Sequence, residues 1–253
     1  MSRKAVFMQV LFILSLAVPA STLRAAQPGP LDLRLTDCLQ WGAVWKTIPL
    51  SHALGQLGGC VEGGYVLFGL EQTLRDGKEP AIKISRLDIK QGTALGAALK
   101  QILRQLPPYE IEVVSDHLID LYPKGAKKDP ENLMNLRVSA FDTSDKDAYT
   151  ILGNPRVVIP ALDAALTPKP EPGKRLLTLY FGGYHPPGPP VTLHLKNATV
   201  RDILNAAAVA SERFFPDKEP LGWVYTFDPA KSLVSGYRYT WGTLYSLPNG
   251  WSG

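Results

Sequence analysis

Residue types that build common catalytic and metal sites are scarce in this sequence. Its 253 residues include two cysteines and four histidines, His52, His117, His185 and His194. The cysteines do not form a Cys-x-x-Cys motif and the histidines lack the spacing of metal ligands, so no redox pair or zinc site is indicated. A Gly-x-Ser-x-Gly elbow and a phosphate-binding loop with its lysine are also absent. We therefore expect no enzyme, cofactor or metal; a hydrolase with an unrecognised site is an alternative.

Long apolar runs are scarce as well. The one such run extends from Ala5 to Ala20 and follows a short basic region. This pattern predicts a secretory signal peptide over residues 1–26, cleaved after Ala20, Ala25 or Ala26. An uncleaved membrane anchor is the alternative, and no other run is long enough to span a bilayer. We expect a periplasmic or secreted protein without a transmembrane segment in the mature chain.

The excess of positive charge is small. The full chain has 27 Lys and Arg against 23 Asp and Glu, a net charge of +4. Residues 1–26 contain three basic residues and no acid, so their removal leaves 24 against 23, a net charge of +1. A nearly neutral chain lacks the basic footprint of a nucleic-acid-binding protein, so no nucleic acid partner is expected.

The two cysteines predict a disulfide bond in an exported chain. Cys38 and Cys60 are the only pair that the sequence offers. Closing a loop of this length stabilises a protein by about 3 kcal/mol on the chain-entropy model. Two buried free thiols are the alternative to the bond.

Residues 82–114 carry the clearest local pattern. Apolar side chains recur there at three- and four-residue spacing, which predicts an amphipathic helix with one buried face. Thr93 is expected to cap the helix and Pro107 to end it. The flanking runs alternate like strands. The apolar face comprises Leu95, Ala98, Leu99, Ile102, Leu103 and Leu106.

The order strand, helix, strand, strand, helix, strand is predicted twice along the chain. One copy lies in residues 27–123, a polar linker in 124–132, and a second copy in 133–253. Residues 87–93 match residues 193–199 through strand, polar turn and cap, which favours a divergent duplication. The predicted fold class is α+β, with two tandem βαββαβ-type modules whose small mixed sheets are each packed by two helices.

A family resemblance rests on the first copy. Thr47-Ile48-Pro49-Leu50 leads into a helix that carries Ala53-Leu54, and the buried-type strand 65–70 follows. A second apolar helix at 95–103 then precedes the aromatic-containing strand 109–113. This order resembles the short N-terminal domain shared by secretins and TonB-dependent transducers.

The resemblance covers residues 43–122, with a weaker second copy over 136–228. It implies a periplasmic docking module without catalysis, whose partners are envelope proteins such as a secretin or a TonB-linked complex. Family members carry a pore or barrel domain after this module, and no such region follows here, so we do not expect the chain to be the pore.

The C-terminal region carries the most distinctive surface residues. Tyr237, Tyr239 and Trp241 alternate on one face of an expected strand, and Tyr245 and Trp251 follow. Such aromatic side chains stack on sugars or anchor a partner, so a glycan- or peptidoglycan-binding protein is the alternative function. Cross-strand packing that closes the sheet is the structural interpretation.

A Pro-rich loop is the other surface candidate. It begins at Tyr184-His185 and continues to Pro190, and such a segment is recognised by a partner or acts as a rigid connector. Downstream, Thr199 belongs to an Asn-x-Thr sequon, but its place between a strand and a helix favours a helix cap. The whole pattern predicts an exported docking or scaffold module of the bacterial cell envelope, in a secretion or TonB-type assembly, which associates through a sheet edge or a helix face.

Overall fold

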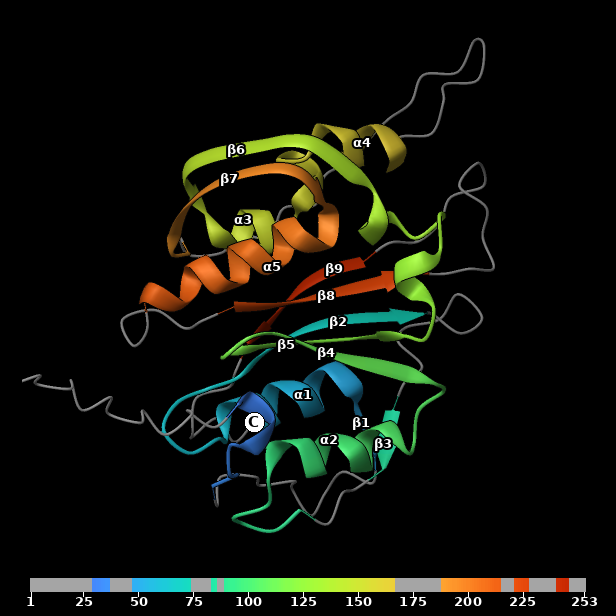
Figure 1. Ribbon diagram of the computed structural model, residues 1–253, viewed down its shortest axis with the longest axis vertical. Helices are drawn as coiled ribbons and strands as arrows, with labels where there is room; N and C mark the ends of the chain where they lie inside the picture. Colours follow the sequence, from blue (N-terminus) through green and yellow to red (C-terminus); the bar gives the residue numbers. More distant parts are fainter. Residues whose placement is uncertain are drawn as a thin grey trace, which may run out of the picture.

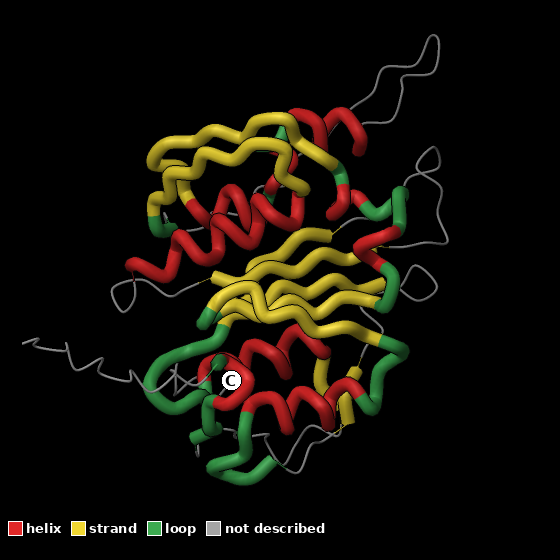
Figure 2. Tube along the Cα trace, in the orientation of Figure 1, coloured by secondary structure: helices red, strands yellow, loops and turns green. Residues whose placement is uncertain are grey.

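The chain folds into a central sheet with helices on both faces, as a computed structural model shows (Figure 1). Strands and helices alternate along the sequence, and this mixture confirms the α+β class. Figure 2 shows the layers by element type. The structure describes residues 29–36, 47–73, 83–85, 89–166, 188–214, 221–227 and 240–245.

The first half of the chain, residues 47–123, contributes two helices and five strands. A short 3-10 helix, η1 (Pro30–Asp32), precedes this half. The elements of the first half are β1 (Thr47–Pro49), α1 (Leu50–Gly59), β2 (Leu67–Thr73), β3 (Lys83–Ser85), α2 (Leu95–Leu103), β4 (Tyr109–Ser115) and β5 (Leu118–Pro123).

The second half, residues 133–245, follows the short 3-10 helix η2 (Ala126–Lys128) and begins with the 3-10 helix η3 (Leu133–Asn135). Its further elements are β6 (Arg137–Asp147), α3 (Ala148–Gly153), η4 (Pro155–Val157), α4 (Pro160–Leu166), β7 (Pro190–Thr199), α5 (Val200–Ser211), η5 (Glu212–Phe214), β8 (Leu221–Phe227) and β9 (Thr240–Tyr245).

Both halves contribute strands to one five-stranded sheet of order β4-β5-β2-β8-β9. Strand β2 is parallel to both of its neighbours, β5 and β8, whereas β4 and β9 pair antiparallel at the two edges. The sequence prediction of a separate small sheet in each half does not match this arrangement. The physical reason is that β2 would otherwise leave a buried strand edge unpaired, and β8 supplies its partner.

The sheet has a hydrophobic core on each face. Phe68 and Leu70 of β2 pack toward α1 and α2, and Leu67 packs on the opposite face, toward α3 and α5. Burial on both faces explains why β2 and β5 read as nearly continuous apolar runs. The antiparallel ribbon β6–β7 lies outside α3 and α5, and the short pair β1–β3 lies beside α1 and α2 (Figure 1).

Helix α2 forms as predicted, but its cap differs. Its N-cap residue is Ala94, which makes no side-chain capping bond, so the prediction that Thr93 caps the helix is wrong. Segment 29–36 takes over this role through its backbone: the amide of Leu95 donates to the carbonyl of Leu33, and the amide of Leu35 donates to that of Thr93. The buried face consists of Leu95, Ala98, Leu99 and Ile102.

Helix α5 begins with the cap that the sequence indicates. The Thr199 hydroxyl accepts from the amide of Asp202, and the Asp202 carboxylate accepts from the amide of Thr199, which forms a capping box. Part of the predicted second copy, residues 167–187, lies outside the described residues. No helix within the described ranges has the length and apolar character needed to cross a bilayer.

Candidate functional site

Strand β4 forms one edge of the sheet. It pairs with β5 along one side, and no strand of the described residues pairs with its other side. The register is regular from Tyr109 to Val113 and shifts between Val113 and Ser115, so Val114 lies in a bulge. An edge of this kind presents amide and carbonyl groups that can pair with another chain.

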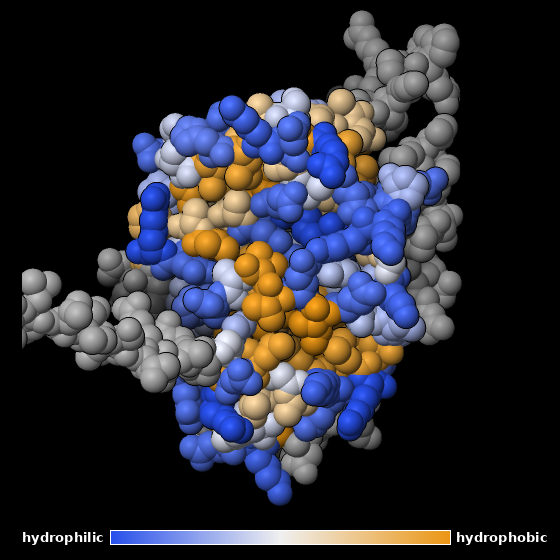
Figure 3. Space-filling model, viewed as in Figure 1, coloured by the Kyte–Doolittle hydropathy of each residue, from blue (hydrophilic) through white to orange (hydrophobic). Residues whose placement is uncertain are grey.

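The same edge exposes apolar side chains. Val113 and Val114 are 45% and 38% exposed, and among the described residues only Val157 is a further exposed large hydrophobic residue. Figure 3 shows an apolar patch in the middle of the viewed face, where Figure 1 places β4. The two valines lie beside backbone groups that no described strand pairs with, and together they give this surface the properties of a docking edge.

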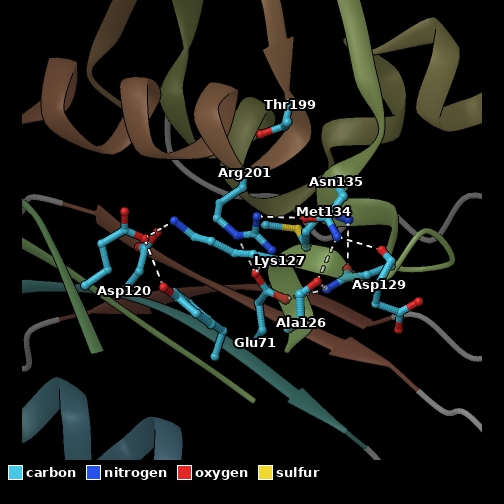
Figure 4. A network of polar contacts seen from close by, with 12 residues as sticks. Glu71, Asp120, Ala126, Lys127, Asp129, Met134, Asn135, Thr199 and Arg201 are labelled. Carbon is cyan, nitrogen blue, oxygen red and sulfur yellow. Dashed lines mark hydrogen bonds and ion pairs between the residues drawn. The ribbon is translucent and has the colours of Figure 1, made fainter. Parts of the chain in front are cut away.

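A buried polar cluster lies on the face of the sheet that α5 covers. Glu71 of β2 and Asp120 of β5 are only 2% and 1% exposed, and Arg201 and Asn205 reach them from α5. Figure 4 shows Arg201 extending from the helix toward Glu71. We define the buried polar cluster as Glu71, Asp120, Asn132, Arg201, Asn205 and Trp223.

Arg201 and Glu71 form the ion pair of the cluster. The Arg201 Nε donates to Glu71 Oε1 over 2.5 Å, and Asn132 Nδ2 donates to Glu71 Oε2 over 2.8 Å. The Arg201 Nη1 also donates to Asn135 Oδ1 over 2.9 Å. Because a buried charge is stable only when it is paired and hydrogen-bonded, these contacts hold α5 in one position on the sheet.

Asn205 connects two strands of the sheet. Its Nδ2 donates to Asp120 Oδ2 over 2.7 Å, and its Oδ1 accepts from Trp223 Nε1 over 2.8 Å. The other carboxyl oxygen, Asp120 Oδ1, has no hydrogen-bond partner among the described residues. It occupies the space beside Gly69, where a Cβ would overlap both this oxygen and the ring of Trp223. The glycine therefore makes room for the carboxyl and the indole.

The cluster holds two carboxyl groups and one guanidinium. The pKa of Asp120 is raised to about 7, chiefly by burial; the hydrogen bond from Asn205 and the charge of Arg201 oppose this shift, and the charge of nearby Glu71 adds to it. Burial also raises the pKa of Glu71, against the opposing effect of Arg201. None of the cluster residues is more than 8% exposed, so the arrangement joins the two halves and offers no open face to a substrate.

Glu112 connects the buried polar cluster to the β4 edge. It lies opposite Asp120 in the strand register and accepts from the Lys127 ammonium and from the Tyr122 hydroxyl. Burial, followed by the charge of Glu112, raises the pKa of Tyr122 to about 12. One face of β4 is therefore acidic, and part of its charge is balanced from within the chain.

Comparison with known proteins does not assign the chain to a family. No protein-family model, curated protein or solved structure matches the chain. The resemblance to the short domain of secretins and transducers therefore stays a prediction, and so do the exported location and the envelope partners.

The structure locates part of the predicted surface. Trp241 and Tyr245 belong to β9, where their backbones pair with Tyr225 and Leu221 of β8. The side chains of β9 are not described, so their role as surface or core stays a prediction. The remaining surface candidates lie outside the described residues: Tyr184, His185, Tyr237, Tyr239 and Trp251.

The structure describes one of the two cysteines and three of the four histidines. Cys60 is buried and disulfide-bonded, but Cys38 lies outside the described residues, so the predicted pairing of the two stays a prediction. The described residues contain no group of three His, Cys, Asp or Glu side chains that could hold a metal ion. His185 lies outside the described ranges.

Sequence reasoning missed the buried polar cluster. The usable signal was an acid inside an apolar strand: Glu71 follows the run Leu67–Leu70, and Asp120 interrupts Leu118–Tyr122. Acids are almost never fully buried unless they are paired, so these two positions indicated a buried partner such as Arg201.

Proposed function

We propose that this protein is a non-catalytic docking or scaffold component of the bacterial cell envelope, exported by its N-terminal signal sequence. The observation that carries the proposal is the edge strand β4, which combines an unpaired backbone side among the described strands with two exposed valines. An extended segment of a partner adds to such an edge as a further strand, and main-chain hydrogen bonds supply affinity.

The rigid attachment of β4 to the rest of the fold supports this proposal. Strand β5, its neighbour, is buried along nearly its whole length, and the buried polar cluster ties β5 to α5. A docking edge on a rigid support loses little conformational freedom when a partner binds.

We also propose that the two halves are divergent copies of one module. In each half, the strand before the first helix pairs antiparallel with the strand before the last helix, as β1–β3 and as β6–β7. In each half, that last helix is followed by two antiparallel strands of the shared sheet, β4–β5 after α2 and β8–β9 after α5. The copies differ in which strand of the pair lies next to β2. Failure of α2–β4–β5 and α5–β8–β9 to superpose in an experimental structure would contradict the duplication.

Site-specific photocrosslinking in intact cells tests the docking function. A benzophenone amino acid in place of Val113 should crosslink to a defined envelope protein. The same amino acid in place of Val157 is a matched control, because Val157 is also exposed and apolar but lies on η4. Equal labelling from both positions, or none from Val113, would overturn the proposal.

A second measurement separates docking from the alternative function. Purified protein is tested for sedimentation with insoluble peptidoglycan, before and after Trp241→Ala. Binding that Trp241→Ala abolishes would favour the glycan-binding alternative, and docking through β4 predicts no such dependence.

A further inference from the structure

Strand β4, at the edge of the sheet formed by the described strands, has two chemically different faces. Glu112 pairs with Asp120 in the register and so lies on the face toward α5, and Glu110 lies two residues before it on the same face. Ile111 and Val113 alternate with these acids and lie on the opposite face. A strand added to this edge meets carboxylates on one side and apolar groups on the other.

The acidic face is only partly neutralised within the chain. The Lys127 ammonium pairs with Glu112, whereas Glu110 is exposed and makes no ion pair among the described residues. Directly opposite side chains on neighbouring strands have Cβ atoms about 5 Å apart, so a positive charge on an added strand would lie close to Glu110.

We propose that the partner of β4 is a protein segment of about five extended residues that alternates basic and apolar side chains, and this proposal rests on the docking function above. The basic side chains lie beside the two glutamates, and the apolar ones beside Ile111 and Val113. The length follows from the regular register of Tyr109 to Val113, because the bulge at Val114 ends regular pairing.

A second copy of the same chain fits this edge poorly. Antiparallel pairing of two β4 strands centred on Ile111 places Glu110 of one copy opposite Glu112 of the other, and does so twice by symmetry. Like charges directly opposite one another destabilise a strand pair. The charge pattern of β4 therefore favours a basic segment from a different protein.

Peptide binding to the purified protein tests the proposed chemistry. The probes are two fluorescein-labelled peptides of seven residues: one alternates lysine with valine, and the other carries glutamate in place of lysine. In fluorescence anisotropy, the basic peptide should bind at least about tenfold more tightly than the acidic one at low salt, and its affinity should fall as salt rises.

Charge reversal on β4 provides the sharper comparison. Glu110→Lys should weaken binding of the basic peptide about tenfold at low salt and strengthen binding of the acidic one. Glu110 is exposed, so the fold should tolerate the change, and circular dichroism checks this. Glu62→Lys, at an exposed acid in the loop after α1, is the matched control and should leave both affinities unchanged.

The outcomes distinguish this inference from the docking function beneath it. Crosslinking of a partner from position 113 together with equal binding of both peptides would overturn the basic-strand inference alone. Failure of the crosslinking and of both peptides would overturn the docking function as well. Crosslinking of the chain to itself, with a dimer in sedimentation equilibrium, would show a second copy as the occupant and contradict the proposed partner.

Discussion

Deprotonation of Asp120 should make the protein less stable as the pH rises. The carboxyl has an ordinary pKa of 3.8, and burial raises it to about 7 in the fold. The charged groups that face it are Glu71 from β2, Glu112 from β4 and Arg201 from α5, with Asn205 as its hydrogen-bond donor. Between the two pKa values the folded chain holds a proton on Asp120 that the unfolded chain has released.

The magnitude follows from linkage. Because the folded state binds more protons in this window, the free energy of unfolding falls as the pH rises, and the stabilisation is complete only below the unfolded pKa. A shift from the ordinary 3.8 to about 7 makes Asp120 contribute a loss of about 2–3 kcal/mol from pH 5 to pH 8. Burial raises the pKa of Glu71 too, so that group acts in the same direction.

Urea unfolding at constant ionic strength, followed by far-UV circular dichroism from pH 5 to pH 8, measures this effect. Asp120→Asn keeps the shape of the side chain and removes the titration, so it should flatten the decline and raise stability at pH 8 relative to the original chain. Asp145→Asn, at an exposed acid whose left-handed backbone (φ 47°) also suits asparagine, is the control and should leave the slope unchanged. An Asp120→Asn variant with the original slope, or an original chain that gains stability toward pH 8, would refute the reasoning.

Three further substitutions probe the fold, each measured as a change in the free energy of unfolding in urea. Gly69→Ala should lower it by about 3 kcal/mol, because the added Cβ overlaps a carboxyl oxygen and an indole ring; Gly64→Ala, where a Cβ meets open space, should have little effect. Arg201→Ala should lower it by about 3–5 kcal/mol, since it leaves a buried carboxylate unpaired, and a loss under 1 kcal/mol would contradict the ion pair. Thr199→Ala should lower it by about 1 kcal/mol through loss of the capping box, while Thr93→Ala should be nearly neutral because Thr93 makes no cap; equal losses would refute this contrast.

Local patterns in the sequence predicted individual elements well. The apolar spacing between Leu95 and Ile102 indicates a helix from nearby residues alone, and Thr199 caps its helix through contacts within four residues. These features depend on neighbours along the chain, which a sequence displays directly.

The arrangement of elements depended on distant contacts and was harder to predict. Thr93 failed as a cap because a segment some sixty residues earlier in the chain satisfies the first turn of α2. The shared sheet depends on pairing between β2 and β8. An apolar pattern indicates that a strand is buried, but it does not indicate which strand it pairs with. The buried polar cluster likewise joins Glu71 to Arg201, which are far apart in the sequence. The only sequence signal for the cluster was the unusual position of an acid within an apolar run.

The parallel pairing of β2 with β8 also affects the order in which the protein folds. Gly69 lies beside Trp223, a separation of 223 − 69 = 154 residues, so β2 gains one of its two neighbours only when nearly the whole chain is present. Pairing over such a distance closes a long loop and slows folding. During synthesis, which starts at the N-terminus, the face of β2 and β5 that α5 later covers is open to water. This face carries the two acids Glu71 and Asp120. A holding chaperone that binds nascent strands would act during this interval, and residues 1–123 produced alone would remain aggregation-prone.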